Sequence, residues 1–357
     1  MNVDSRNDRN RCLGSGLSGF VARRRAVQVA SLMAVAVLAA ACGAPNPSLG
    51  ESGGDPTADQ GRSTQPDSAG LVDLGNGRSI FMECRGSGGP TVVLVAGMGE
   101  RAETWMATSA DPSSTQGSVF PAVGGFTRVC AYDRPGTGAA TESGVEPTRS
   151  TPMEQAATVG DSAADLDRLL TASGETGPYV MVGHSLGGPI VRLYAAAHPE
   201  EVAGLVFVDA LSEDVGDGLT PPQLASFEQL NDPVSQGRPA GSEEALYSAS
   251  VVPLLREAAD VTAVPTVILT ADQWPFTPEF FESSESSGAL PEFVTKEFTD
   301  ALWAAQLKAQ DAFAAKYPGA NHITKTDAGH YIHRDNPELV ITSIRDVVDQ
   351  VRSEPSP

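Results

Sequence analysis

The 357-residue sequence is poor in positive charge. It has 24 Lys and Arg against 45 Asp and Glu, which gives a formal net charge of −21. Nucleic-acid binding depends on clustered Lys and Arg side chains that contact phosphates, so this charge balance excludes nucleic acid as an expected partner. We attribute the acidity to solubility outside the cell rather than to a binding specificity.

Cysteine is also scarce, with four residues in the chain. None is arranged as CxxC or with histidines at a metal-binding spacing, so we expect no metal site. Cys12 and Cys42 lie in the N-terminal region, which leaves Cys84 and Cys130. For an exported protein in an oxidising environment these two are the natural disulfide pair, and two buried free thiols are the alternative.

The N-terminal region predicts an export signal over residues 1–41. The arginine triplet at 23–25 precedes AVQVASLMAVAVLAAAC, an uncharged stretch that is short for a membrane-spanning helix. Its end resembles the lipobox of bacterial lipoproteins, although Leu38 lies one position earlier than in the commonest pattern. The resemblance implies a lipid on Cys42 and attachment of an exported protein to a membrane surface, and plain secretion is the alternative.

Residues 42–70 are rich in Gly, Pro, Ser and acids and are expected to form a disordered tether, because they cannot bury enough apolar area to fold. The folded part is then expected over 71–353, a length that suits one α/β domain with an insertion. Residues 211–262 contain paired prolines and weakly helical pieces, and they predict a small cap over the carboxyl end of the sheet, where such sheets hold their sites.

Elsewhere in the folded part, short Val- and Ile-rich segments alternate with helical patterns. This alternation predicts a mostly parallel sheet with helices on both faces. The expected strands are 71–75, 78–84, 91–97, 127–133, 179–185, 204–209, 266–272 and 321–326, and the expected helices are 153–172, 190–198, 292–317 and 337–352.

The strongest local signal is VMVGHSLGG, in which residues 183–187 fit the pattern G-x-S-x-G between a strand and a helix. Ser185 is expected on a tight turn with its hydroxyl projecting, and Gly183 and Gly187 are small enough for the chain to pass closely. The helix N-terminus offers N–H groups and a positive dipole end to a developing oxyanion. The pattern therefore marks Ser185 as a candidate nucleophile.

A serine nucleophile needs a base, and His330 is the strongest candidate. It follows the last predicted strand in AGHYIHRDNPELV, in a Gly-flanked loop from which a base could reach the serine. His184 adjoins the serine but points elsewhere by strand alternation, and His322 lies inside a strand. His198 is expected at a helix end, and His333 is expected to contact solvent or a helix start.

The order of these motifs resembles the α/β-hydrolase superfamily over nearly all of 71–353. RVCAYDRPGTG is similar to the family's strand-4 signature, GHSLGG to its nucleophile elbow, and AGHYIH with DNPELV to its histidine loop. The resemblance implies a mostly parallel sheet of about eight strands, flanked by helices, with a small cap insertion after strand 6. It also implies adjacent second and fourth strands, which would place Cys84 beside Cys130.

One departure from the family concerns the loop after strand 3. The family usually has His-Gly there, whereas this chain has AGMG at 96–99. The resemblance implies that the backbone N–H groups of Met98 and Leu186 form the oxyanion hole. Because the donors are backbone groups, the change from His to Ala need not disable the site; the alternative is that Met98 only lines a pocket.

A second departure concerns the acid that orients the histidine. The family's usual acid follows strand 7, but that strand ends LTADQWPF here, with a tryptophan at the expected place and Asp272 two residues early. Some members carry the acid after strand 6, where Asp209 ends its strand, 24 residues after Ser185. That separation suits one helix and one strand. We therefore favour Asp209 over Asp272, with Glu213 and Asp214 as further alternatives.

Together these residues predict a serine hydrolase that cleaves an ester, or less readily an amide, of a small or acyl substrate through an acyl-enzyme. Ser185 would attack, His330 would transfer the proton, and Asp209 would orient the histidine. No cofactor is implied, the expected partner is a small-molecule substrate, and we expect a monomer. The alternative is a non-catalytic surface lipoprotein that binds a small apolar ligand.

Overall fold

The computed structural model describes residues 67–111, 115–141, 144–152, 157–231, 251–259, 264–287 and 290–353. The predicted export signal 1–41, Cys42 and the predicted tether up to residue 66 lie outside these residues, as do 232–250 and 260–262 of the predicted cap. Within the described ranges, no helix combines the length and the apolar character needed to cross a membrane.

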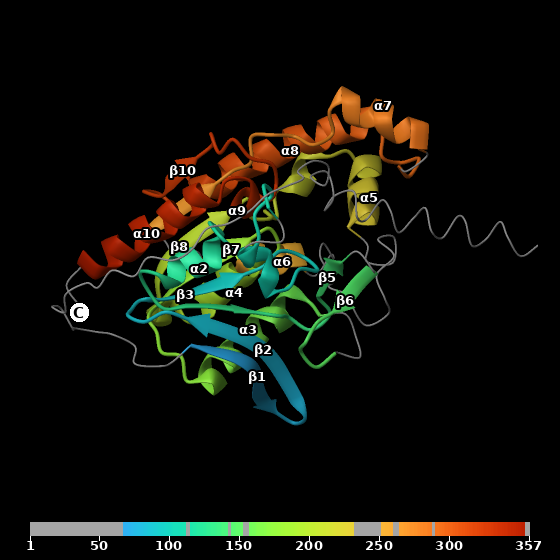
Figure 1. The fold of residues 1–357 in the computed structure, drawn as a ribbon. Helices are drawn as coiled ribbons and strands as arrows, with labels where there is room; N and C mark the ends of the chain where they lie inside the picture. Colours follow the sequence, from blue (N-terminus) through green and yellow to red (C-terminus); the bar gives the residue numbers. More distant parts are fainter. Residues whose placement is uncertain are drawn as a thin grey trace, which may run out of the picture.

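The centre of the fold is an eight-stranded sheet with the strand order β1-β2-β4-β3-β7-β8-β9-β10 (Figure 1). β2 pairs antiparallel with both β1 and β4, and every other pair in this sheet is parallel. The predicted mostly parallel sheet of about eight strands is confirmed. Its strands are β1 (Ser68–Gly75), β2 (Arg78–Arg85), β3 (Thr91–Val95), β4 (Val129–Tyr132), β7 (Tyr179–His184), β8 (Val202–Val208), β9 (Thr266–Leu269) and β10 (Asn321–Ile323).

Two apolar clusters pack against opposite faces of the sheet, as expected for central strands that are apolar along their whole length. One cluster joins the sheet to α3, α4 and the end of α8, and the other joins it to η1, α2, α9 and α10. These helices are η1 (Ala102–Met106), α2 (Val119–Gly124), α3 (Val159–Ser173), α4 (Gly187–Ala197), α8 (Lys296–Ala315), α9 (Ile332–Asp335) and α10 (Pro337–Ser353), and the short η2 (Pro199–Glu201) follows α4.

Two predicted helices begin later than expected, because a threonine caps each of them. α3 begins at Val159, since the Thr158 hydroxyl accepts the Asp161 N–H at 3.1 Å and the Asp161 carboxylate accepts the Thr158 N–H at 2.9 Å. α8 begins at Lys296, since the Thr295 hydroxyl accepts a backbone N–H from the first turn at 3.2 Å. The predicted starts at 153 and 292 ignored these caps, and residues 153–156 lie outside the described part of the chain.

The folded part starts earlier than the predicted residue 71. β1 already includes residues 68–70, which pair with residues 82–84 of β2. Backbone hydrogen bonds extend the strand there without apolar side chains, so the sequence pattern carried no sign of them. A second small sheet was also missed: β5 (Gly138–Thr141) and β6 (Gly144–Pro147) form an antiparallel hairpin.

Further helices come from two segments of the chain, and the first of these segments lies within the predicted cap, 211–262. The first contains η3 (Val215–Gly218), α5 (Pro221–Leu230) and α6 (Val251–Glu257), and the second contains α7 (Pro278–Ser287) and the beginning of α8. α5, α7 and the beginning of α8 lie at one end of the molecule in Figure 1. An apolar cluster joins η3 and α5 to α8 through Val215, Phe227, Phe298, Leu302 and Ala309.

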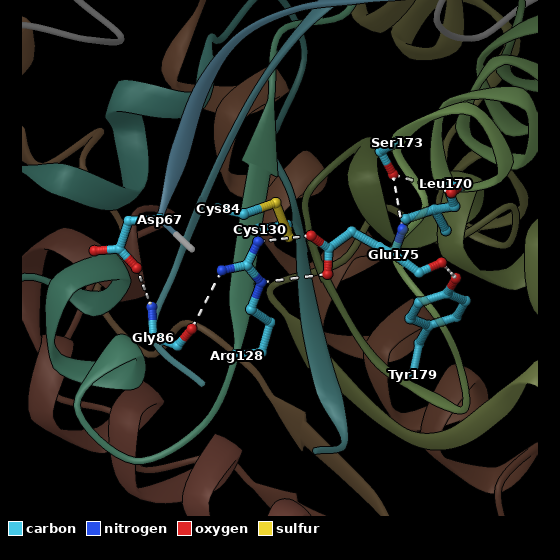
Figure 2. Close-up of a disulfide and its surroundings, with 9 residues drawn as sticks. All are labelled: Asp67, Cys84, Gly86, Arg128, Cys130, Leu170, Ser173, Glu175 and Tyr179. Carbon is cyan, nitrogen blue, oxygen red and sulfur yellow. Dashed lines mark hydrogen bonds and ion pairs between the residues drawn. A yellow bond between two sulfur atoms is a disulfide. The ribbon is translucent and has the colours of Figure 1, made fainter. Parts of the chain in front are cut away.

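The predicted disulfide is present between Cys84 of β2 and Cys130 of β4 (Figure 2). The two cysteines are directly opposed in the antiparallel pair, with their Cα atoms 4.1 Å apart, and both are buried. A buried ion pair lies beside them, in which Arg128 Nη2 is 2.7 Å from Glu175 Oε1. The disulfide thus ties β2, which lies next to the edge strand β1, to β4 by a covalent bond.

Candidate active site

Ser185 lies immediately after β7 on a tight turn into α4. Its φ of 50° is in the left-handed region, which is strained for a residue other than glycine and is typical of a projecting nucleophile. A Cβ atom added to Gly183 would lie 2.6 Å from the Gly187 carbonyl oxygen, and one added to Gly187 would lie 2.2 Å from the Val95 carbonyl oxygen. Only glycine fits at these two positions, as the motif requires.

Asp209 lies immediately after β8, and its buried side chain contacts the predicted base. Asp209 Oδ2 is 2.6 Å from His330 Nδ1, and Asp209 Oδ1 accepts the Ala271 N–H at 3.1 Å. The residue is 3% exposed, whereas the His330 side chain is 42% exposed. One carboxylate oxygen is therefore fixed by the backbone while the other meets the histidine.

Asp272, the alternative acid, is exposed and bound elsewhere. Its Oδ1 accepts the Ala328 N–H at 3.1 Å and the Thr326 hydroxyl at 3.3 Å. Although desolvation opposes the change, these hydrogen bonds, led by that of Ala328, lower the pKa of Asp272. Asp272 organises the loop before His330, and among the described residues no hydrogen bond joins the two side chains.

The remaining two acids considered from the sequence form ion pairs at the base of the cap. Glu213 is buried, with Oε2 2.6 Å from Arg192 Nη1, and its other oxygen contacts Lys316. Asp214 Oδ2 lies 3.2 Å from the same lysine. These pairs fasten the loop after β8 to α4 and α8, so neither carboxylate lies against His330.

His330 is held in one orientation by Asp209. Because Nδ1 faces the carboxylate, Nδ1 carries a proton and Nε2 is the nitrogen available to accept one. Desolvation lowers the pKa of His330, but the hydrogen bond and the negative charge of Asp209 raise it more, and the net shift is upward. In the described part of the chain no hydrogen bond joins the Ser185 hydroxyl to His330, a contact that often tightens only when substrate binds.

The loop after β3 presents one candidate oxyanion donor, the Met98 N–H, and the turn after Ser185 presents the other, the Leu186 N–H. Neither the Met98 N–H nor the Leu186 N–H has an acceptor among the described residues. Arg134 is buried and donates to the carbonyl oxygens of Ala96 at 2.8 Å and Gly97 at 2.5 Å. The C=O and N–H of a trans peptide point in opposite directions, so holding the Gly97 carbonyl also fixes the direction of the Met98 N–H.

The comparison with known families agrees with this geometry. The model described as "Alpha/beta hydrolase family" matches residues 92–342, a range that contains Ser185, Asp209, His330 and the loop after β3. The chain belongs to the alpha/beta hydrolase family.

Three proteins to which this alpha/beta hydrolase is similar differ from it in most of their sequence. An uncharacterized protein of Schizosaccharomyces pombe is 36% identical over 102 residues, which make up 29% of this chain and only 17% of that protein. The uncharacterized protein YqjL of Bacillus subtilis is 24% identical over 263 residues, which cover 74% of this chain and 85% of YqjL. A solved thermophilic esterase from Thermogutta terrifontis is 18% identical, with a TM-score of 0.49 over 81% of this chain and 100% of the esterase.

One histidine of this alpha/beta hydrolase differs in part from its prediction. His333 was expected to contact solvent or a helix start; it lies in the first turn of α9, but it is fully buried. α9 packs on η1, which places the His333 ring centroid 4.5 Å from that of Trp105 and His333 Nε2 2.9 Å from the Thr104 hydroxyl. Burial, and next the charge of His184, lower the pKa of His333 well below its ordinary value. His322 and His198 occupy the strand and helix-end positions predicted for them.

The hydrolase site also contains residues that the sequence pattern did not reveal, Glu100 and Arg134. Glu100, His184 and His333 each place one ligand-type atom within 4.8 Å of the others, a spacing that a metal ion could use. The Glu100 carboxylate, however, already accepts hydrogen bonds from Gly97 and Thr104. We therefore assign no metal to this cluster and treat it as a hydrogen-bond network.

Proposed function

We propose that this alpha/beta hydrolase is a serine hydrolase that cleaves carboxylic esters of small or acyl substrates through an acyl-enzyme. The contact between Asp209 Oδ2 and His330 Nδ1 at 2.6 Å carries the proposal. It leaves His330 Nε2 as the proton acceptor, at the carboxyl end of the sheet where Ser185 also lies. With Ser185 as nucleophile, His330 as base and Asp209 as orienting acid, the three residues would fill the roles that acyl transfer needs.

The proposed reaction begins when the Ser185 hydroxyl attacks the ester carbonyl while His330 Nε2 takes its proton. The negative charge that develops on the carbonyl oxygen is stabilised by the N–H groups of Met98 and Leu186. Loss of one such donor typically costs about 10²–10³-fold in turnover. His330 then protonates the leaving alcohol, and it activates the water that releases the acid from Ser185.

A panel of p-nitrophenyl esters of increasing acyl length tests this function, with matching p-nitroanilides to compare esters with amides. We expect the wild type to turn over at least one ester, and we expect the S185A variant to lose at least about 10⁴-fold in turnover. Circular dichroism on both proteins controls for folding. Folded wild type that hydrolyses none of the esters would instead favour the ligand-binding lipoprotein.

We also propose that the protein is exported and anchored to a membrane surface through a lipid on Cys42. The support is the charge and apolar pattern of residues 1–41 and the small residues before Cys42. Growth of expressing bacteria with an alkyne-tagged fatty acid tests the proposal. We expect label on the wild type and none on the C42A variant; an unlabelled wild type in the culture medium would indicate plain secretion.

A further inference from the structure

A buried hydrogen-bond network lies behind the candidate active site and joins three of its segments. Its centre is the carboxylate of Glu100, whose side chain is 18% exposed. Glu100 Oε2 accepts the Gly97 N–H at 3.2 Å, and Oε1 accepts the Thr104 hydroxyl at 2.8 Å. The same Oε2 lies 3.2 Å from Nδ1 of His184, the residue before the candidate nucleophile. One carboxylate thus contacts three segments: the loop 96–99 after β3 (the oxyanion loop), η1, and the turn 183–187 around Ser185 (the nucleophile elbow).

Both ring nitrogens of His184 face acceptors. Nδ1 faces the Glu100 carboxylate, and Nε2 lies 3.0 Å from the backbone carbonyl oxygen of His330. A neutral imidazole has one N–H and one bare nitrogen, so it could donate to only one of these oxygens. With a charged Glu100, both contacts are satisfied when both nitrogens donate, as in the doubly protonated ring. The His184 side chain is 1% exposed.

The other hydrogen bonds of the network agree with this distribution of protons. The Thr104 hydroxyl donates its one proton to Glu100, so it accepts from His333 Nε2. His333 is then neutral, with a bare Nδ1 that has no partner among the described residues. Burial alone would raise the pKa of Glu100, but the hydrogen bond and charge of His184, with a smaller effect of the Thr104 hydrogen bond, hold it well below its usual range.

We propose that Glu100 and His184 are positioning residues, a buried ion pair that holds the oxyanion loop, the nucleophile elbow and the His330 backbone in one geometry. This inference rests on the proposed serine hydrolase function. Gly97 has its N–H held by Glu100 and its C=O held by Arg134, so the next N–H, that of Met98, is fixed in direction. Removing the charge of Glu100 would loosen the oxyanion loop and the His330 backbone together.

The surroundings of His184 contain no other carboxylate that could replace Glu100 in this pair. The rings packed on it belong to Trp105, His330, Tyr331 and His333, with centroids between 4.4 Å and 6.4 Å away. Among the described residues Glu100 is the one acid within ion-pair distance of His184. The partially buried pair is costly to break, because a lone charge would stay behind in the protein.

The first test is the turnover of the E100Q variant with the best ester, because Gln keeps the size of the side chain and removes its charge. We expect kcat to fall about 10²-fold with KM changed by less than about 3-fold, since a displacement of about 1 Å in a catalytic group can cost that much. The matched control is E103Q, whose carboxylate is more exposed and pairs with Arg101 and Arg149. A lower Tm with an unchanged kcat in E100Q would reduce Glu100 to a structural role and overturn the proposal.

The second test is NMR of the full chain labelled with ¹⁵N-histidine, at pH 8. An ordinary histidine is neutral there because its pKa is about 6.5. We expect one histidine with two protonated ring nitrogens that is lost in H184Q and changed in E100Q but not in E103Q. A neutral His184 in the wild type would overturn the proposal. So would purified wild type that binds one equivalent of zinc when the E100Q variant binds none, because Glu100 and His184 would then be metal ligands.

The two tests separate this inference from the proposed function. The NMR measurement needs no substrate. The spectrum of the wild type alone shows whether one histidine carries two ring protons, even if a variant fails to fold. Wild type that hydrolyses no ester would contradict the serine hydrolase function while a doubly protonated His184 still showed the ion pair. An active enzyme with a neutral His184 would support the function and contradict the ion pair.

Discussion

Ser185 and Asp209 hold equivalent places at the ends of two neighbouring parallel strands, β7 and β8. Each is a non-glycine residue with positive φ, 50° for Ser185 and 41° for Asp209. Each donates its backbone N–H to the end of the next strand, Ser185 to Val208 at 3.2 Å and Asp209 to Leu269 at 2.8 Å. Two strained turns of the same kind thus place a hydroxyl and a carboxylate side by side at the carboxyl ends of adjacent strands.

We expect the D209N variant to lose about 10⁴-fold in kcat, the effect of the corresponding change in a comparable triad. The amide cannot stabilise the charged form of His330 and favours the wrong tautomer. The matched control is D272N, which keeps an oxygen that can accept the Ala328 N–H and should lose less than about 10-fold. Ester turnover by both purified variants checks this, and the reverse ranking would assign the acid to Asp272.

The pH dependence of kcat/KM should report the protonation of His330. The base works only when neutral, so activity is lost as the pH falls through its pKa. Asp209 raises the pKa of His330, so we expect the acid-side midpoint of the wild type above the ordinary value of about 6.5. The D209N variant lacks the negative charge that raises the pKa of His330, while the desolvation that lowers this pKa remains. Its residual activity should therefore have its acid-side midpoint at a lower pH. A midpoint that stays or rises would contradict the assignment of this pair.

Gly187 should tolerate no side chain, because an added Cβ atom would lie 2.2 Å from the Val95 carbonyl oxygen. We expect G187A to lower the free energy of unfolding by about 1–3 kcal/mol through overpacking and to reduce turnover by displacing the elbow. The control is G70A in β1, where an added Cβ has nothing within 4 Å and should change stability by less than about 0.5 kcal/mol. Equal urea midpoints for the two variants would contradict the described elbow.

The disulfide between Cys84 and Cys130 closes a segment with a sequence separation of 46 residues. A covalent link of this kind restricts the unfolded chain, and we expect the C84A/C130A double variant to lose about 2–4 kcal/mol of unfolding free energy. Urea unfolding under oxidising conditions measures the loss, and wild type with dithiothreitol should approach the variant. A difference below about 0.5 kcal/mol would show that strand pairing alone secures β2 on β4.

The sequence was sufficient for those parts of the site that depend on local geometry. The pattern at 183–187 requires a tight turn, and the chain order places Asp209 one strand further along, so both could be predicted before their contacts were seen. His330 followed from its place after the last strand. Because Trp274 stands at the usual place of the acid, the sequence favoured Asp209, and the carboxylate of Asp209 lies against His330.

The rest of the site depends on contacts between residues far apart in the chain. Glu100 contacts His184, which is 84 residues away in the sequence, and Thr104 contacts His333, which is 229 residues away. No local sequence pattern indicates either contact. His333 lies in the first turn of α9, one of the two places predicted for it, but the packing of α9 on η1 buries it, and no local pattern indicates that contact. The Thr158 cap, by contrast, had a local signal in Asp161 three residues later.

Covalent labelling with a fluorophosphonate probe tests the central claim most directly, since it requires an activated serine and no knowledge of the substrate. We expect one equivalent of probe on the full chain, located by peptide mass spectrometry on Ser185, with no labelling of S185A and strongly slowed labelling of D209N. Folded wild type that takes up no probe, or that is labelled at another residue, would contradict the account.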